Sequence, residues 1–208
     1  MPIKYRRFEN FQLWQTKVGS DSYAQESEGL CLLGESEVFR LRGITNPRRK
    51  REYILSRALI RYALSQVFSY PVDYWILTEC SNAPPSVKNL PTPVFFSLSH
   101  SDSNIYFVLA KRPIGIDVEL IKPRDNIHAL AQQFMHANEL IQLEEAADEL
   151  FFYRTWSAKE AYFKALTPEV QASMVMSEVL IASVLNEEAW YQVDFSDQQF
   201  SRVVVARR

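Results

Sequence analysis

The segment 115–119, Gly-Ile-Asp-Val-Glu, carries two acidic side chains at a spacing that could hold a metal ion. Asp117 and Glu119 lie two positions apart inside an apolar run. If this run is a β-strand, both carboxylates point to the same face, because successive side chains of a strand alternate between faces. Taken alone, such a pair is more often a solvated strand end than a metal site, since carboxylates generally stay exposed.

A second segment, residues 156–164, reads Trp-Ser-Ala-Lys-Glu-Ala-Tyr-Phe-Lys and adds a third carboxylate and a lysine. Glu160 and Lys164 are four positions apart, so on a helix they share one face, with Trp156 one turn before Glu160. By itself such a pair would only stabilise a helix, by about 0.2–0.5 kcal/mol. We interpret Trp156 as a packing residue that orients the acidic face, not as a ligand.

Together the two segments predict a magnesium site for phosphoryl transfer. A strand with Asp117 and Glu119, packed on a helix with Glu160, brings three carboxylates together beside Lys164. Like charges this close repel one another unless a cation lies among them. An all-oxygen ligand set suits magnesium, which completes its shell with water and phosphate. The expected substrate group is therefore a diphosphate.

The residue types between these charges resemble the signature of the 4'-phosphopantetheinyl transferases, of the larger, surfactin-synthetase-activating type. That signature is Gly-Ile-Asp-x-Glu followed by Trp-Ser-x-Lys-Glu-Ala-x-x-Lys. The family usually carries a Ser-His-Ser segment ahead of the acidic strand, and residues 99–101 match it. It also carries an Arg-Ala-Leu-x-Arg run on an earlier helix, and residues 57–61 match that run. The resemblance extends over about residues 38–166.

The resemblance implies an enzyme that transfers the 4'-phosphopantetheine arm of coenzyme A to a serine of an apo acyl, peptidyl or aryl carrier protein. Adenosine 3',5'-bisphosphate is the product released. By position, Asp117, Glu119 and Glu160 would be the magnesium ligands, and Glu160 is also the candidate base for the carrier serine. Either a carboxylate or a metal-bound water could accept the serine proton, and the sequence does not choose between them.

Four residues are implied contacts of coenzyme A. Lys164 would stabilise the phosphate from which the bisphosphate departs. His100, with Ser99 beside it, would contact the coenzyme A phosphates, and Arg57 belongs to a basic helix near the nucleotide.

The chain departs from the family pattern in two places. Relatives often have a Gly-Lys-Pro turn before the Ser-His-Ser segment, whereas residues 81–89 read Ser-Asn-Ala-Pro-Pro-Ser-Val-Lys-Asn, with Lys88 the candidate substitute for the nucleotide-binding lysine. Relatives also often follow the second segment with Gly-x-Gly-Leu, whereas residues 165–170 read Ala-Leu-Thr-Pro-Glu-Val. The first departure motivates an alternative hypothesis, a catalytically weak coenzyme A-binding protein.

Local patterns predict the elements that position these residues. Asn46 and Pro47 start a helix that runs to about residue 68, and a second helix runs from about 149 to 166 and is stopped by Pro168. Apolar and β-branched runs predict strands in addition to the acidic one, at residues 94–99, 105–110, 181–185, 189–193 and 202–206.

Strands and helices recur in two similar runs, before and after Pro113. The family resemblance implies an α+β fold of two pseudo-symmetric subdomains in one chain, with coenzyme A in the cleft between them, where ligand pockets tend to lie. We expect residues 1–112 to form an N-terminal half. Residues 113–208 would form a C-terminal half with the metal-ligand motifs, and the protein would be a monomer.

Composition narrows the class of protein. A chain of 208 residues with 47% hydrophobic residues can bury a sizeable core, which excludes disorder as its main state. A third hypothesis is a nucleic-acid or anionic-surface binder that uses the basic run 48–51. The net charge of −2 argues against it, because the chain has no global basic field. No secretion signal and no membrane span of ~20 apolar residues is evident, so we expect a cytoplasmic protein with no membrane partner. Cys31 and Cys80 lack metal-type spacing and are expected to be plain thiols.

Overall fold

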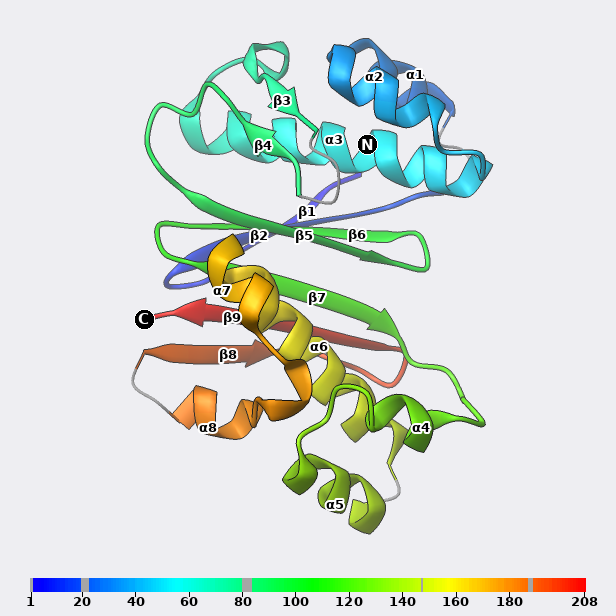
Figure 1. Ribbon diagram of the computed structural model, residues 1–208. Helices are drawn as coiled ribbons and strands as arrows, with labels where there is room; N and C mark the ends of the chain where they lie inside the picture. The colour runs from blue at the N-terminus through cyan, green and yellow to red at the C-terminus, as the bar shows by residue number, and fades with distance from the viewer. Residues whose placement is uncertain (1, 20–22, 80–83, 147, 187–188) are drawn as a thin grey trace. The chain divides into compact units, whose positions relative to one another are not determined.

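The computed structural model describes residues 2–19, 23–79, 84–146, 148–186 and 189–208. The chain divides into two compact units (Figure 1). Unit 1 holds Met1–Val94 and Ser103–Phe107, and unit 2 holds Phe95–Asp102 and Val108–Arg208. Helices and strands occur in both units, which confirms the predicted α+β class. The pseudo-symmetry of two halves divided at residues 112 and 113 stays a prediction.

The longest helix of unit 1 is α3 (Pro47–Phe68), where the sequence predicts it. The Asn46 side chain accepts hydrogen bonds from the backbone N–H groups of Arg48 and Arg49, at 2.9 and 3.1 Å, so it caps the helix as expected. The other elements of the unit are the antiparallel pair β1 (Lys4–Arg7) and β2 (Phe11–Lys17), the helices α1 (Tyr23–Cys31), α2 (Glu35–Arg42) and η1 (Val72–Tyr74), the pair β3 (Leu77–Thr78) and β4 (Ser86–Val87), and the first residues of β6 (Asn104–Ala110).

Unit 2 is built on a three-stranded antiparallel sheet. Its strand order is β7 (Ile114–Leu120), β9 (Phe200–Arg207) and β8 (Trp190–Asp194), which confirms the acidic strand and the strands predicted at 189–193 and 202–206. The helix α6 (Glu149–Ala165) packs on β7 and β9, with the bounds that the sequence predicts to within one residue. The strand β5 (Phe95–Ser101) and the end of β6 confirm the remaining two strands expected before Pro113.

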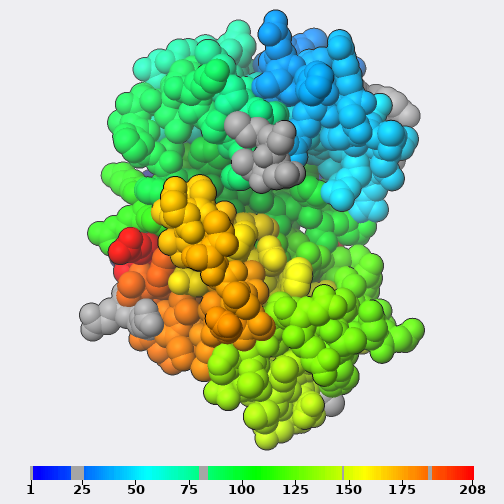
Figure 2. Space-filling view, in the orientation of Figure 1, coloured from blue at the N-terminus to red at the C-terminus, as the bar shows by residue number. Residues whose placement is uncertain are grey.

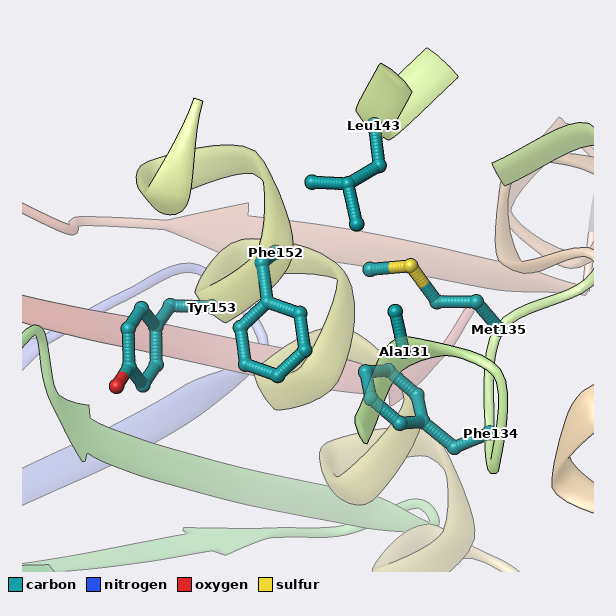
Figure 3. Packing of buried hydrophobic residues seen from close by; sticks show 6 residues of the cluster. All are labelled: Ala131, Phe134, Met135, Leu143, Phe152 and Tyr153. Carbon is teal, nitrogen blue, oxygen red and sulfur yellow. The ribbon is translucent and has the colours of Figure 1, made fainter. Parts of the chain in front are cut away.

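Shorter helices complete unit 2 and hold α6 in place. They are α4 (Ile127–Ala131), α5 (Ala137–Ala146), α7 (Pro168–Ser173), η2 (Met176–Glu178) and α8 (Ile181–Asn186). One side of α6 contributes Phe152 and Tyr153 to an apolar cluster whose other buried members, shown with them in Figure 3, are Ala131, Phe134, Met135 and Leu143. The rings of Phe134 and Phe152 meet edge to face with centroids 5.5 Å apart, an arrangement that aromatic pairs favour. The position of α6 is therefore fixed from two sides, by the sheet and by this cluster.

The strand predicted at residues 181–185 is wrong, because this segment forms helix α8. Its apolar residues Ile181, Val184 and Leu185 are spaced three and four apart and pack on a cluster that contains Val203 and Val205 of β9. A short apolar run does not distinguish a strand from a buried helix by periodicity alone. The helical spacing is the one that lets all three side chains reach the same cluster.

The surface of unit 2 includes α7, which buries none of its residues and is visible in gold on the face drawn in Figure 2. In the part of the chain that the structure describes, no helix is both long and apolar enough to cross a membrane. Cys31 is an exposed free thiol, whereas Cys80 and residues 81–83 lie outside the described residues.

Candidate active site

A pocket of about 270 Å³ in unit 2 collects six of the seven residues that the sequence predicts for the site. They come from three elements, since Ser99 and His100 lie on β5, the two acidic residues on β7, and the Glu160 and Lys164 pair on α6. The full lining is Leu98, Ser99, His100, Asp117, Glu119, Trp156, Glu160 and Lys164.

Gly115 lets α6 approach β7 closely enough to form this pocket. A Cβ atom at this position would lie 1.8 Å from the carbonyl oxygen of Ala161 and 3.0 Å from the backbone nitrogen of Ala165. Real Cβ atoms essentially never come as close as the first of these distances, the second is also tight, and both neighbours are backbone atoms, which cannot rotate away as a side chain can. The glycine of the acidic segment is therefore required by the close approach of a helix backbone to the strand.

Asp117 is the best buried carboxylate of the pocket, with 3% of the residue exposed. Its Oδ1 atom accepts hydrogen bonds from the Nζ of Lys164 at 2.7 Å and from the hydroxyl of Ser99 at 3.1 Å. Its Oδ2 atom is also buried, and it has no hydrogen-bond partner among the described residues. A buried, unpartnered carboxylate oxygen is costly, so an atom of this kind points to a ligand such as a cation.

The electrostatics of the other two carboxylates also indicate a site that needs a cation. Burial raises the pKa of Glu119, and the negative charge of Asp117 raises it further, against the lowering effects of Lys164 and of hydrogen bonds from Ser101 and Trp156. Burial likewise raises the pKa of Glu160, where Lys164 lowers it and Asp117 raises it. In both groups, burial and a neighbouring negative charge disfavour the ionised form.

The donor set of the pocket fits magnesium. Among the described residues, no group of three or more histidine, cysteine, aspartate or glutamate side chains has the mutual spacing of a preformed metal site. Magnesium, however, commonly takes only one or two carboxylates from the protein and the rest of its shell from waters and substrate phosphates. The unpartnered Oδ2 of Asp117 and the carboxylates of Glu119 and Glu160 supply oxygen donors to one pocket, as that chemistry requires.

Trp156 packs as the sequence predicts and also does something that the sequence prediction missed. Its ring meets Phe134 edge to face, with centroids 4.5 Å apart, and so joins the apolar cluster beside α6. The indole also hydrogen-bonds to Glu119, and this bond lowers the pKa of that carboxyl. One side chain thus links the core to the acidic side of the pocket.

Lys159, next to Glu160, is a second residue whose role the sequence prediction missed. The ammonium is fully buried and lies 2.7 Å from a carboxylate oxygen of Glu139. It also donates to the backbone carbonyls of Phe134, Met176 and Val179, at 2.9, 3.0 and 2.6 Å. Burial lowers its pKa, and the bond to Glu139 opposes this shift.

The sequence did contain a signal for this role. Lys159 lies seven positions after Phe152 and three after Trp156, so it falls within the apolar stripe of α6 and not on the acidic face. The lysine therefore joins α6 to residues 134–139 and 176–179, and we count it as structural.

Arg57, the seventh predicted site residue, lies on α3 of unit 1 and is not among the residues that line the pocket. Its side chain is buried, pairs with Glu79 and lies over the ring of Tyr53, with 4.4 Å from the guanidinium carbon to the ring centroid. Its contact with coenzyme A stays a prediction.

Comparisons with known proteins agree with the residues gathered here. Residues 113–204, which carry β7 and α6, match the 4'-phosphopantetheinyl transferase superfamily. The chain is 33% identical over 117 residues to the 4'-phosphopantetheinyl transferase psf-1 of Bacillus pumilus, an alignment that covers 55% of this chain and 49% of that protein. It is 33% identical over 116 residues to the 4'-phosphopantetheinyl transferase gsp of Aneurinibacillus migulanus, covering 54% of this chain and 47% of that protein.

A longer alignment joins the chain to the 4'-phosphopantetheinyl transferase HetI of Nostoc sp., with 26% identity over 163 residues, 76% of this chain and 68% of that protein. The chain spans about half the length of the first two relatives. Residues 113–204, the segment with the acidic strand and the Lys-Glu helix, are therefore the part of the chain that is similar to the 4'-phosphopantetheinyl transferase superfamily.

Proposed function

We propose that this protein is a magnesium-dependent 4'-phosphopantetheinyl transferase that moves the 4'-phosphopantetheine arm of coenzyme A to a serine of an apo carrier protein. The observation that carries the proposal is the pocket of unit 2, where Asp117, Glu119 and Glu160 lie with Lys164 and His100. The match of residues 113–204 to the 4'-phosphopantetheinyl transferase superfamily supports it. The released product is adenosine 3',5'-bisphosphate.

In the proposed reaction, the Oγ atom of the carrier serine attacks the β-phosphorus of coenzyme A. A phosphate ester bond to the serine forms as the bond to the departing bisphosphate breaks, and the serine proton passes to Glu160. Such transfer asks the protein mainly for positioning and charge neutralisation, because negative charge spreads over the phosphoryl oxygens.

The residues of the pocket divide these tasks. Asp117, Glu119 and Glu160 would hold magnesium, which supplies charge neutralisation to the diphosphate when bound. Lys164 would stabilise the charge that develops on the leaving bisphosphate. Its Nζ lies 2.7 Å from Oδ1 of Asp117, one of the proposed metal ligands. His100 would contact the coenzyme A phosphates, together with Arg57 of unit 1, whereas the hydroxyl of Ser99 donates its one proton to Asp117.

We further infer a monomeric, cytoplasmic protein whose partners are coenzyme A and an apo carrier protein, without nucleic acid or membrane. The net charge of −2 supports the exclusion of nucleic acid, because the chain as a whole has no excess of basic charge to attract a phosphate backbone. Two pseudo-symmetric α+β subdomains remain part of this proposal.

The test is incubation of the full chain with coenzyme A, magnesium and a panel of apo acyl and peptidyl carrier proteins, followed by intact mass measurement. The expected result is a carrier mass increased by one phosphopantetheine, lost with EDTA and absent for a carrier whose acceptor serine is replaced by alanine. The alternative, a catalytically weak coenzyme A-binding protein, predicts calorimetric binding of coenzyme A without any mass change. That outcome across the panel would refute the transferase.

A further inference from the structure

Three serines at alternating positions of β5 connect this strand to the edge of the β7-β9-β8 sheet in unit 2. Each hydroxyl oxygen accepts a hydrogen bond from one backbone N–H group of β7, where a neighbouring strand would otherwise pair. The bonds are Ile116 N–H to Ser97 at 3.2 Å, Val118 N–H to Ser99 at 3.2 Å, and Leu120 N–H to Ser101 at 3.0 Å. Side chains therefore replace a backbone ladder along this edge.

Two of these three hydroxyls also contact the acidic residues of the pocket. The Oγ of Ser99 donates to Oδ1 of Asp117 at 3.1 Å, and the Oγ of Ser101 lies 3.4 Å from Oε2 of Glu119 and donates to it. In each case the carboxylate belongs to the residue just before the one whose N–H the serine accepts. At the equivalent position for Ser97 the residue is Gly115, which has no side chain to contact.

This arrangement uses the hydroxyl group in both of its capacities. A serine hydroxyl has one proton to donate and can accept hydrogen bonds on its oxygen. The backbone N–H group fixes the oxygen, so the proton can be directed at the carboxylate, and such charge-assisted bonds are stronger than neutral ones. In Asp117, Ser99 and Lys164 both bind Oδ1, and Oδ2 is left buried without a hydrogen-bond partner among the described residues.

We propose that Ser99 and Ser101 are positioning residues that orient Asp117 and Glu119 for metal binding. The inference rests on the proposed function, because it takes these two carboxylates as magnesium ligands. Partners that hydrogen-bond to ligating groups orient them, and replacing such partners typically weakens metal binding. Ser97 makes the same backbone bond without a carboxylate contact, so the chain contains a matched control.

The test measures binding of Mn²⁺ to the full chain by electron paramagnetic resonance, with and without coenzyme A. Manganese serves as the probe because it shares the octahedral oxygen chemistry of magnesium. Ser99→Ala and Ser101→Ala should each weaken Mn²⁺ binding by about 10- to 100-fold, and Ser97→Ala should bind it as the wild type does. All three variants should lower the Tm, since each loses one bond to β7. Ser101→Thr, which keeps a hydroxyl, should restore binding.

A double variant separates a direct effect from a general one. If Ser101 acts through Glu119, then Ser101→Ala combined with Glu119→Gln should bind Mn²⁺ no more weakly than Glu119→Gln alone. Equal weakening by Ser97→Ala would show that loosening of β5 is the cause and would overturn the proposal, as would wild-type binding in Ser101→Ala. Failure of the wild-type protein to bind Mn²⁺ at all would instead refute the metal site of the proposed function.

Discussion

At the scale of single residues, Asp117 is the centre of the candidate site. It is buried, one of its oxygens is held by Lys164 and Ser99, and the other has no hydrogen-bond partner among the described residues. A buried aspartate with an unpartnered oxygen lowers the stability of the fold unless a ligand binds to that oxygen. That cost favours a functional role for the residue over a structural one.

The first prediction concerns the metal ligands themselves. Asp117→Ala and Glu160→Ala should each abolish most phosphopantetheine transfer. Removing a ligand weakens the binding of magnesium, and the negative charge of the diphosphate is then not neutralised. The mass-based transfer assay measures the loss, and far-UV circular dichroism should match the wild type. The exposed Glu144 of α5 offers a control, since Glu144→Ala should keep full activity. Near-wild-type turnover of either ligand variant at saturating magnesium would contradict the assignment.

The second prediction is that Lys164 acts on the transition state and not on ground-state binding. An interaction that strengthens only as charge develops lowers kcat when removed, with little change in affinity. Lys164→Ala should bind coenzyme A with magnesium at close to wild-type affinity by calorimetry, yet lose about two to three powers of ten in kcat. Lys164→Arg should recover only part of the rate, since a planar guanidinium is not a compact point charge. Normal kcat with much weaker binding would make Lys164 a binding residue instead.

At the scale of elements, the site depends on how closely α6 approaches β7. Gly115 permits the approach, and the apolar cluster with Phe152 and the buried Lys159 hold the helix on its other sides. Gly115 and Lys159 both belong to the family signature, and both therefore affect the candidate site by fixing the position of α6.

The third prediction follows from the space at Gly115. Gly115→Ala should lower the free energy of unfolding by about 1–3 kcal/mol, the usual cost of overpacking, because its Cβ would meet helix backbone. It should also lower kcat, since moving α6 displaces Glu160 from Asp117. Urea unfolding and the transfer assay measure the two effects. Gly43→Ala is the control, because its Cβ would lie 3.4 Å from the nearest atom, and it should change stability by less than about 0.5 kcal/mol. Unchanged stability of Gly115→Ala would be inconsistent with this packing.

The fourth prediction concerns the buried pair of Lys159 and Glu139. Lys159→Met should lower the free energy of unfolding by about 3–5 kcal/mol, because it leaves a buried carboxylate without its countercharge. Denaturant unfolding checks this, with the exposed Lys111→Met as the control. A stable Lys159→Met protein that had lost coenzyme A affinity would show that Lys159 binds substrate and would contradict its structural role.

At the scale of the whole molecule, the predicted coenzyme A contacts are divided between the two units. His100 lines the pocket of unit 2, whereas Arg57 lies on α3 of unit 1 and pairs with Glu79. Helix α3 also carries Arg61, which is buried as well and pairs with Glu37. The second arginine makes it possible to separate a binding role from a packing role.

The fifth prediction uses this comparison. Arg57→Ala and His100→Ala should raise the KM for coenzyme A roughly ten-fold or more, without a similar rise in the KM for the carrier, since each removes a charge-assisted phosphate contact. Arg61→Ala should lower the Tm but leave the KM for coenzyme A unchanged. Steady-state kinetics with each substrate varied in turn provides the measurement. If Arg57→Ala behaves like Arg61→Ala, Arg57 is a structural residue.

Several features were predictable from sequence because their cause is local. The cap at Asn46, the 22 residues of α3 and the bounds of α6 follow from side chains within a few positions of each helix end. The pairing of Asp117 with Glu119 on one face follows from the period of a strand, and that of Glu160 with Lys164 from the period of a helix. The fixed residue types around those charges were sufficient to predict the similarity that residues 113–204 have to the 4'-phosphopantetheinyl transferase superfamily.

Only the tertiary structure decided which groups those side chains meet. Residues 181–185 form a helix because a distant cluster on β9 accepts their side chains, and Lys159 turns inward because Glu139 and three carbonyls lie there. Ser101 gains a role because β5 lies along the edge of β7. The periodicity of apolar residues predicts the local conformation of the backbone. The burial and the hydrogen bonds of a side chain depend on segments that are distant in the sequence and close only in the folded structure.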